Sequence, residues 1–263
     1  MSQKCSIFAH MKPLILISND DSINAKGLRH LVDCVSSMAD IYVVAPNQPQ
    51  SGQSSAFTVN SPLRIIEHDD YNGAKMFSVT GTPVDCVKLA LHKIVPRKPD
   101  FLLSGVNHGS NAGNSVIYSG TMGAAFEGCM LGIPSVGYSL LSHSLTADFT
   151  ECTPHIINIT RRVMQQGLPD GVCLNVNFPA NAKIEGLKVV RAARSHWTEE
   201  YQEYVDPHGK PFFWLTGRII NEEPENPETD LYWLEHNFGT IVPVRADQNA
   251  TDTIPNINNL LDL

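Results

Sequence analysis

The chain has 263 residues, of which 42% are hydrophobic and 17% are charged, and its formal net charge at neutral pH is −8. This composition is typical of a globular protein with a large buried core, and it excludes a disordered chain. The acidic balance, without any run rich in lysine or arginine, argues against binding to a nucleic-acid polymer.

Residues 1–10 form a short polar extension that we expect to be disordered, and they do not resemble a secretory signal. No apolar run approaches the roughly 20 residues of a membrane-spanning helix, so no membrane partner is expected. The cysteines are scattered and include no CxxC pair: Cys5, Cys34, Cys86, Cys129, Cys152 and Cys173. Most lie in apolar patterns, which predicts reduced core thiols in a cytoplasmic protein and argues against a disulfide framework.

Short apolar strands alternate with amphipathic helices from residue 11 to about residue 195. Periodicity predicts strands at 14–18, 41–46, 75–79, 100–107, 133–140 and 172–178, and helices at 25–38, 81–95, 121–132 and 155–167. Strands joined by helices are typical of βαβ units, which build a parallel sheet covered on both faces. The expected fold class is therefore α/β, with a doubly wound and mostly parallel sheet.

The pattern changes after residue 195, where two aromatic-rich strands surround the turn at Asp206–Gly209. They predict a projecting β-hairpin whose exposed aromatic residues mediate self-association into a homodimer or homotetramer. A heteromeric interaction module is the alternative interpretation of the same surface. We divide the chain into an extension at 1–10, a core at 11–195, a hairpin with a return strand at 196–245, and a tail at 246–263 that docks on the body or on a neighbouring copy.

Oxygen donors follow several predicted strands, at the carboxyl ends where a doubly wound sheet binds ligands. The donors are Asn19, Asp20, Asp21, the loop 47–57, Ser104, Gly105, Asn107 and His108. Two adjacent carboxylates are unfavourable unless a cation neutralises them, and hard divalent cations prefer oxygen ligands. The residues alone favour a metal site at Asp20 and Asp21, while capping of the next helix by one of them remains an alternative.

Two further segments precede predicted helices and are rich in small residues. Ser119–Thr121 could bind phosphate at a helix N-terminus or could simply cap that helix. For Gly81–Pro83, helix capping is the favoured interpretation, because Asp85 follows Thr82 at the spacing of a capping box. A Walker A loop is absent, and no GxGxxG follows the first strand.

Several stretches together resemble the survival protein SurE family of metal-dependent nucleotidases. They are ILISNDD, VVAPNQPQSGQSSAFT, SVTGTPVDCVKLAL, LLSGVNHGSNAG, YSGTMGAAFEG with IPSVGYS, and LNVNFP, in the family's order over roughly residues 13–245. The resemblance implies a Rossmann-like core, a projecting hairpin and a C-terminal segment that is exchanged between subunits. It also implies hydrolysis of nucleoside 5′- and 3′-monophosphates and, in some members, of short polyphosphate.

The same resemblance implies one divalent ion per subunit, Mg²⁺ or Mn²⁺. Its ligands would be Asp20, Asp21, Ser51 and Asn107. Either aspartate would orient or deprotonate the attacking water. The phosphate or substrate would be held by Asn19, Ser104, Gly105, Ser119, Gly120 and Thr121.

The chain departs from the family pattern at Ser22, where a glycine is usual, and in the stretch GTIVPVRAD near the end. A positive φ angle at Ser22 would be costly. This departure keeps open a non-catalytic nucleotide- or metal-sensing protein. An aspartyl-phosphate mechanism is disfavoured, because it requires two aspartates separated by one residue. His108 could protonate a leaving group or could make a plain polar contact.

Overall fold

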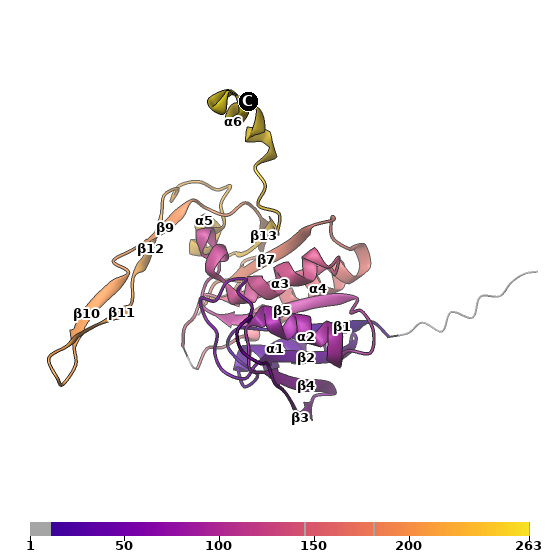
Figure 1. The fold of residues 1–263 in the computed structure, drawn as a ribbon. Helices are drawn as coiled ribbons and strands as arrows, with labels where there is room; N and C mark the ends of the chain where they lie inside the picture. Colours follow the sequence, from indigo (N-terminus) through magenta and orange to yellow (C-terminus); the bar gives the residue numbers. More distant parts are fainter. Residues whose placement is uncertain (1–11, 145, 181, 263) are drawn as a thin grey trace, which may run out of the picture.

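A central nine-stranded sheet organises the computed structural model, which describes residues 12–144, 146–180 and 182–262 (Figure 1). The order across the sheet is β3-β4-β2-β1-β5-β6-β7-β13-β8. The strands are β1 (Leu14–Ser18), β2 (Asp40–Pro46), β3 (Ile65–Tyr71), β4 (Ala74–Val79), β5 (Phe101–His108), β6 (Ser135–Leu140), β7 (Val172–Phe178), β8 (Leu187–Val189) and β13 (Gly239–Arg245). The predicted extension at 1–10 lies outside the described residues.

The adjacent strands β4-β2-β1-β5-β6-β7 all pair in parallel with one another, which confirms the predicted doubly wound α/β sheet. β3 and β13 add antiparallel pairings to β4 and β7. The chain leads from β1 to β2 on one side, and from β4 it returns to β5 on the other side of β1. The carboxyl ends of β1 and β5 therefore meet at a topological switch point, where such sheets bind ligands.

Helices cover both faces of the sheet. α1 (Lys26–Val35) and α4 (Thr153–Gln166) pack on one face, and α2 (Pro83–Leu89) and α3 (Gly120–Met130) pack on the other (Figure 1). Ile15 and Ile17 of β1 point to the first face, and Leu16 points to the second. This burial on both sides explains why β1 is apolar from Leu14 to Ile17.

Shorter turns complete the core. They are a π-helical turn (Ala90–Ile94) after α2, and 3₁₀ turns at Gly113–Tyr118 (η2) and Thr150–Cys152 (η3). Five cysteines are buried free thiols, as predicted: Cys34, Cys86, Cys129, Cys152 and Cys173. Within the described part of the chain, no helix has the length and apolar character that crossing a membrane requires.

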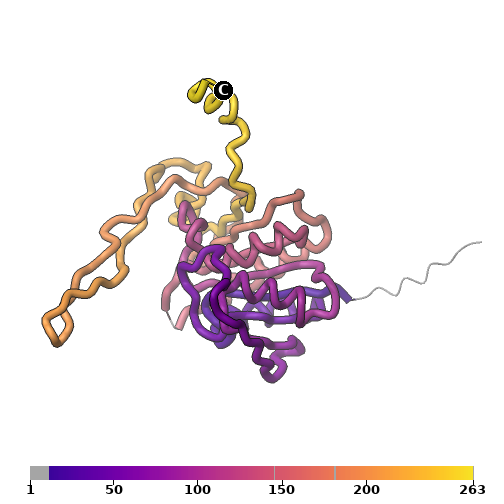
Figure 2. The backbone as a smooth tube through the Cα atoms, in the orientation of Figure 1, coloured from indigo at the N-terminus to yellow at the C-terminus, as the bar shows by residue number. Residues whose placement is uncertain are grey.

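The predicted hairpin is present and projects from the body (Figures 1 and 2). It consists of two successive ladders, β9 (Ser195–Thr198) with β12 (Arg218–Asn221), and β10 (Tyr201–Val205) with β11 (Pro211–Leu215). Its exposed aromatic side chains include Tyr201, Tyr204, Phe212, Phe213 and Trp214. The predicted homodimer or homotetramer remains a prediction.

The chain after the hairpin returns to the sheet. α5 (Asp230–Glu235) leads into β13, and the tail ends in a 3₁₀ turn (Thr251–Thr253) and α6 (Ile254–Leu261). α6 has no buried residue and stands apart from the body (Figure 2). Docking of the tail on the body is therefore not seen, and its exchange with another subunit remains a prediction.

The start of α2 confirms the predicted capping box. The Thr82 hydroxyl accepts a hydrogen bond from the Asp85 backbone N–H at 3.2 Å, and the Asp85 carboxylate accepts one from the Thr82 N–H at 2.9 Å. Thr82 also donates to the Ala56 carbonyl at 2.7 Å, and Asp85 accepts from the Thr58 hydroxyl at 2.7 Å. One helix cap thus also anchors the end of the 47–57 loop.

Replacement of Thr82 by alanine removes the cap and the anchor. We expect Thr82→Ala to lower the free energy of unfolding by about 1–2 kcal/mol, because the Asp85 N–H loses its acceptor. Thr82→Ser keeps the hydroxyl and serves as the matched control. Urea denaturation of the three proteins measures the difference, and equal losses in both variants would contradict the capping role.

Candidate active site

A cavity of about 520 Å³ opens at the carboxyl ends of β1 and β5. Four of the predicted site residues line it: Asp20, Ser51, Asn107 and Ser119. The cavity also reaches His108, Asn111, Tyr118, His143 and the base of the hairpin. The structure therefore brings together residues from the end of β1, the 47–57 loop, the end of β5 and the start of α3.

Asp20 is buried, with 4% of its surface exposed. One carboxylate oxygen, Oδ1, accepts a hydrogen bond from the Thr121 hydroxyl at 2.5 Å, and the Asp20 carbonyl accepts one from the Gln50 N–H at 2.7 Å. Burial, and secondarily the charge of Asp21, raise the pKa of Asp20 to about 6, although the bonds from Thr121 oppose this shift. Ionisation of Asp20 in the folded protein therefore costs free energy, and a bound cation would offset that cost.

Asp21 points toward the end of β5. Its Oδ2 accepts hydrogen bonds from the His108 backbone N–H at 2.9 Å and from the His108 ring nitrogen Nδ1 at 3.1 Å. The edge of the same ring packs against Phe149 with centroids 5.1 Å apart. The polar contact considered for His108 is thus present, and its effect is to orient Asp21.

Two asparagine side chains at these strand ends each donate a hydrogen bond through Nδ2 to a backbone carbonyl. Asn107 donates through Nδ2 to the Gly109 carbonyl at 2.9 Å, a hydrogen bond that does not use its Oδ1. Asn19 donates through Nδ2 to the Ser22 carbonyl at 2.9 Å. Three buried oxygens at these strand ends have no hydrogen-bond partner among the described residues: Ser18 Oγ, Asn19 Oδ1 and Ser104 Oγ.

The donor set fits a hard divalent cation. Two carboxylates, an amide oxygen and the Ser51 hydroxyl are all oxygen ligands, which Mg²⁺ and Mn²⁺ prefer. Across the described residues, no three histidine, cysteine or acidic side chains gather as a metal-binding group, so an ion here would also need the amide and hydroxyl oxygens beside the two aspartates. The raised pKa of the buried Asp20 is the observation that favours a cation here.

The start of α3 lies directly against Asp20. A Cβ atom on Gly120 would lie 2.9 Å from both Cβ and Oδ2 of Asp20, so only glycine permits this approach. Ser119 caps the helix by accepting a hydrogen bond from the Met122 N–H at 3.0 Å. Capping by Ser119 is therefore present, and the helix N-terminus with its partial positive charge is placed beside the cavity.

The other predicted site residues do not line the cavity: Asn19, Asp21, Ser104, Gly105, Gly120 and Thr121. Asn19 and Ser104 are buried at the ends of β1 and β5. Gly105 has φ 119°, and a Cβ there would lie 2.3 Å from the Tyr138 carbonyl oxygen. The ladder between β5 and β6 shifts register between Ser104 and Asn107. This irregularity turns the end of β5 so that Asn107 faces the cavity while Ser104 stays in the sheet.

Ser22 has a positive φ angle despite the cost of that conformation for a residue with a side chain. Its φ is 93° and its side chain is buried. The Ser22 carbonyl accepts the hydrogen bond from Asn19, so the turn holds the polar end of β1 in place. A side chain at such a φ is strained, which is the reason for glycine at this kind of turn.

The sequence did not predict that the base of the hairpin lines the cavity. The hairpin residues that do so are Trp197, Glu200, Tyr201, Leu215 and Thr216. No local pattern signals it, because these residues are far from Asp20 and Asn107 along the chain. The only sequence signal was the aromatic richness of the hairpin, which we assigned to self-association.

The fold and the site define a doubly wound α/β protein with an oxygen-donor cluster and a helix N-terminus at its switch point. The family model for survival protein SurE matches residues 15–199. The chain therefore belongs to the survival protein SurE family.

Relatives of known name extend over nearly the whole chain. The 5'-nucleotidase SurE of Phocaeicola vulgatus is 44% identical over 248 residues, which cover 94% of this chain and 96% of the relative. That of Christiangramia forsetii is 45% identical over 253 residues, with 94% and 96% covered. The crystal structure of the SurE protein from Aquifex aeolicus matches with a TM-score of 0.81 and 32% identity, covering 95% of this chain and 100% of that one.

The raised pKa of Asp20 predicts a specific dependence of stability on pH. The folded state binds this proton more tightly than the unfolded chain, whose carboxyl has the usual pKa of 3.8. Without a cation, the free energy of unfolding should therefore fall as pH rises from about 4 to about 6, and it should stay reduced above pH 6. Asp20→Asn removes the charge and keeps an oxygen for Thr121.

We expect Asp20→Asn to raise the free energy of unfolding at pH 7 by about 1–3 kcal/mol in the presence of a chelator, and to change it little near pH 3.5. Urea denaturation at both pH values measures this difference. Asp69→Asn, at an exposed position of β3, is the matched control. If Asp20→Asn is no more stable than the wild type at pH 7, the claim that the charge on buried Asp20 destabilises the folded protein is contradicted.

Relief of the backbone strain at Ser22 should stabilise the protein. We expect Ser22→Gly to raise the free energy of unfolding by up to about 1 kcal/mol. This is the gain from relieved strain minus the loss from the larger conformational entropy of glycine in the unfolded chain. Ser36→Gly, at a residue with φ −55°, should be destabilising instead. Thermal denaturation of both variants tests the pair, and a loss of stability in Ser22→Gly would contradict the strain.

Proposed function

We propose that the protein is a metal-dependent phosphomonoesterase that hydrolyses nucleoside 5′- and 3′-monophosphates to nucleoside and phosphate, with short polyphosphate as a further substrate. The observation that carries this proposal is the buried Asp20 beside Asp21, facing a cavity that also contains Asn107 and a helix N-terminus. Relatives that are 44–45% identical bear the name 5'-nucleotidase SurE, which supports the same activity.

Asp20, Asp21, Ser51 and Asn107 would hold one divalent ion per subunit, Mg²⁺ or Mn²⁺. When bound, the ion supplies Lewis-acid polarisation of the phosphoryl group and acidifies the attacking water. The neighbouring side chains fix the two carboxylates, since Thr121 holds Asp20 and His108 holds Asp21. Each carboxylate is thereby oriented before substrate arrives, so that one of them positions the water and accepts its proton.

The substrate phosphate would lie at the start of α3, beside Ser119, Gly120 and Thr121. The backbone N–H groups of a helix N-terminus stabilise negative charge, and that charge increases on the oxygens during phosphoryl transfer. Asn19, Ser104 and Gly105 would lie behind the phosphate, at the carboxyl ends of β1 and β5. Asn19 Oδ1 and Ser104 Oγ are buried without a hydrogen-bond partner among the described residues, which supports a role for polar atoms there.

Self-association into a homodimer or homotetramer is part of the same proposal. The apolar side chains of the hairpin and of α6, among them Phe213, Trp214, Ile254 and Leu260, are exposed. A second copy of the chain would cover them, and the tail would be the segment that is exchanged. The five buried free thiols are in keeping with a cytoplasmic enzyme.

Phosphate release from AMP in the presence of Mn²⁺, Mg²⁺ or a chelator tests the activity. We expect release that depends on the metal and that Asp20→Asn and Asp21→Asn each reduce on the order of 100-fold or more, because either change removes a ligand and a fixed charge. Asp69→Asn, the exposed control, should retain wild-type activity.

Adenosine 3′-monophosphate in the same assay compares the two phosphate positions. Absence of release with any metal, together with AMP binding measured by calorimetry, would contradict the hydrolase and support the nucleotide-sensing alternative. Release that persists in the chelator and in both variants would contradict the metal site.

A further inference from the structure

The base of the hairpin forms part of the active-site cavity in the same chain. Trp197 of β9, Tyr201 of β10 and Leu215 of β11 line the cavity that also contains Asp20 and Asn107. We call these three side chains the hairpin-base wall. The oxygen donors of the cavity come from the strand ends and the start of α3, whereas the hairpin contributes these three aromatic or apolar side chains together with Glu200 and Thr216.

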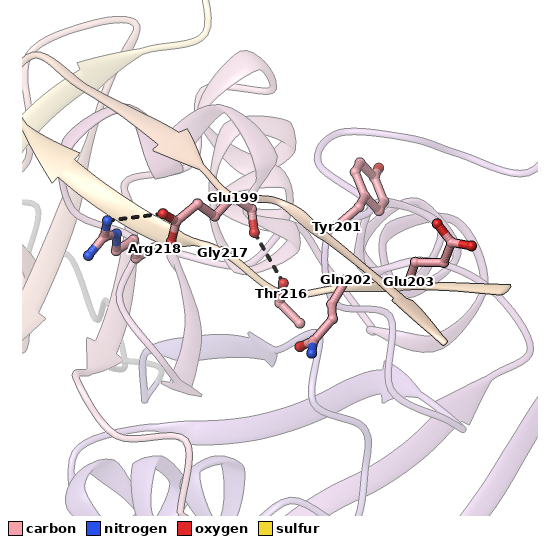
Figure 3. Close-up of a pocket in the computed structure, with 7 residues that line it drawn as sticks. All are labelled: Glu199, Tyr201, Gln202, Glu203, Thr216, Gly217 and Arg218. Carbon is pink, nitrogen blue, oxygen red and sulfur yellow. Dashed lines mark hydrogen bonds and ion pairs between the residues drawn. The ribbon is translucent and has the colours of Figure 1, made fainter. Parts of the chain in front are cut away.

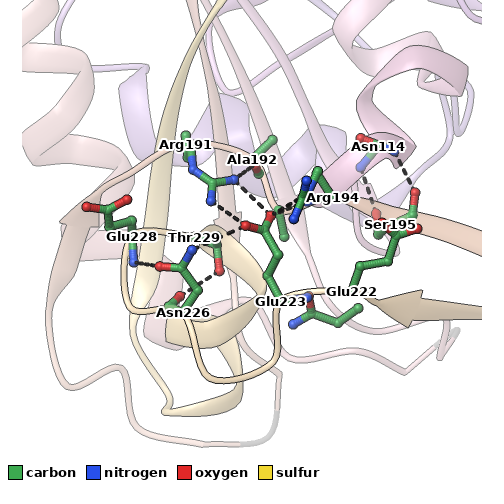
Figure 4. Close-up of polar contacts among 12 residues, drawn as sticks. Asn114, Arg191, Ala192, Arg194, Ser195, Glu222, Glu223, Asn226, Glu228 and Thr229 are labelled. Atoms are coloured by element: carbon green, nitrogen blue, oxygen red, sulfur yellow. Dashed lines mark hydrogen bonds and ion pairs between the residues drawn. The ribbon is translucent and has the colours of Figure 1, made fainter.

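Hydrogen bonds fix the hairpin base to the segment that leads into α3. The Asn114 N–H donates to the Ser195 hydroxyl at 2.9 Å, and Asn114 Nδ2 donates to the Ser195 carbonyl at 2.5 Å (Figure 4). Asn114 belongs to η2, which ends directly before Ser119. The first strand of the hairpin is therefore tied to the start of the proposed phosphate site.

A buried carboxylate strengthens this connection. Asp230 accepts hydrogen bonds from the N–H groups of Gly113 and Ala193, both at 2.8 Å. The Glu223 carboxylate holds the other side of the base, through Arg191 and the Arg194 N–H (Figure 4). The base is thus held by the body of its own chain, whereas the distal ladder β10–β11 extends away from it (Figure 2).

Strand geometry directs the Trp197 ring to the cavity. Residues two apart on a strand share a face, so Trp197 points to the same side as Ser195, which contacts η2. Beyond Trp197 the hairpin bends, with φ 52° at Glu199 and φ 98° at Gly217.

Hydrogen bonds across the two strands hold this bend. The Thr216 hydroxyl donates to the Glu199 carbonyl at 3.1 Å, and Arg218 pairs with the Glu199 carboxylate at 3.2 Å (Figure 3). The Thr216 N–H donates to the Glu200 carbonyl at 2.7 Å. The bend places Tyr201 and its cross-strand partner Leu215 on the cavity as well.

From this arrangement we infer that the hairpin-base wall binds the nucleobase of the substrate, which stacks on the Trp197 or Tyr201 ring. The inference rests on the proposed nucleotidase function. A nucleoside monophosphate combines a charged phosphate with a planar base, and the cavity offers a separate surface for each. Every base has a π-face, so an aromatic wall selects nucleotides over other phosphate esters while tolerating different bases.

Comparison of AMP with ribose 5-phosphate isolates the base. Both carry a 5′-phosphate on ribose, and only AMP has a ring to stack. We expect Trp197→Ala to lower the ratio of kcat/KM for AMP to kcat/KM for ribose 5-phosphate roughly tenfold, and Tyr201→Ser to lower it in the same direction. Trp197→Phe keeps an aromatic face and should retain most of the preference.

Trp214→Ala is the matched control, because Trp214 lies on the same hairpin, is 65% exposed and does not line the cavity. It should leave the AMP preference unchanged even where it alters self-association. An AMP preference that Trp197→Ala and Tyr201→Ser both leave intact would overturn the inference, as would an equal loss in Trp214→Ala.

Fluorescence separates a failure of the inference from a failure of the proposed function. The chain has three tryptophans, so Trp214→Phe combined with Trp233→Phe leaves Trp197 as the only reporter. Titration with adenosine, which has no phosphate, should quench or shift its emission. Quenching without hydrolysis of either ester would support base binding and reject the nucleotidase. No change in emission, together with an AMP preference that Tyr201→Ser leaves intact, would overturn base binding, whatever the activity.

Discussion

The carboxylates of Asp20 and Asp21 repel each other at the end of β1, and the surrounding segments are arranged to hold them there. Thr121 from α3 donates to one carboxylate, His108 from β5 donates to the other, and Gln50 from the 47–57 loop donates to the Asp20 carbonyl. Three segments that are distant in sequence are thereby held at the same strand end. The cost that remains, seen in the raised pKa of Asp20, is what a bound cation would offset.

The doubly wound core could be predicted because its signals are local. β1 is apolar from Leu14 to Ile17 because both its faces are buried, and α2 begins with a capping box that the spacing of Thr82 and Asp85 reveals. β3 could not be predicted in this way. It lies at the edge of the sheet and almost all of its residues are exposed, so no buried face imposes a pattern. α5 has six residues, too few for a clear helical period.

The candidate site could be predicted only where it depends on strand ends. Parallel strands bring their carboxyl ends to one edge, so Asp20 and Asn107 were expected together, and both line the cavity. The sequence also drew attention to the φ angle at Ser22, because glycine is usual at this position and glycine is typical of turns with positive φ. Trp197 could not be placed, since its position follows from the tertiary contact between Asn114 and Ser195. An aromatic hairpin gives the same sequence signal whether it covers a neighbour or lines a cavity.

The contact of Asp230 with Gly113 has a consequence for the order of events during synthesis. The two residues are 117 positions apart, and the loop after β5 lacks this hydrogen-bond acceptor until Asp230 has been made. At ribosomal rates of about 5–20 residues per second, that interval lasts roughly 6 to 23 seconds. Strands β1 to β5 precede Gly113 in the chain, and β6 and β7 are made within this interval, so all of them can pair before Asp230 is available. The nascent chain therefore carries its paired aspartates well before the loop beside them is secured.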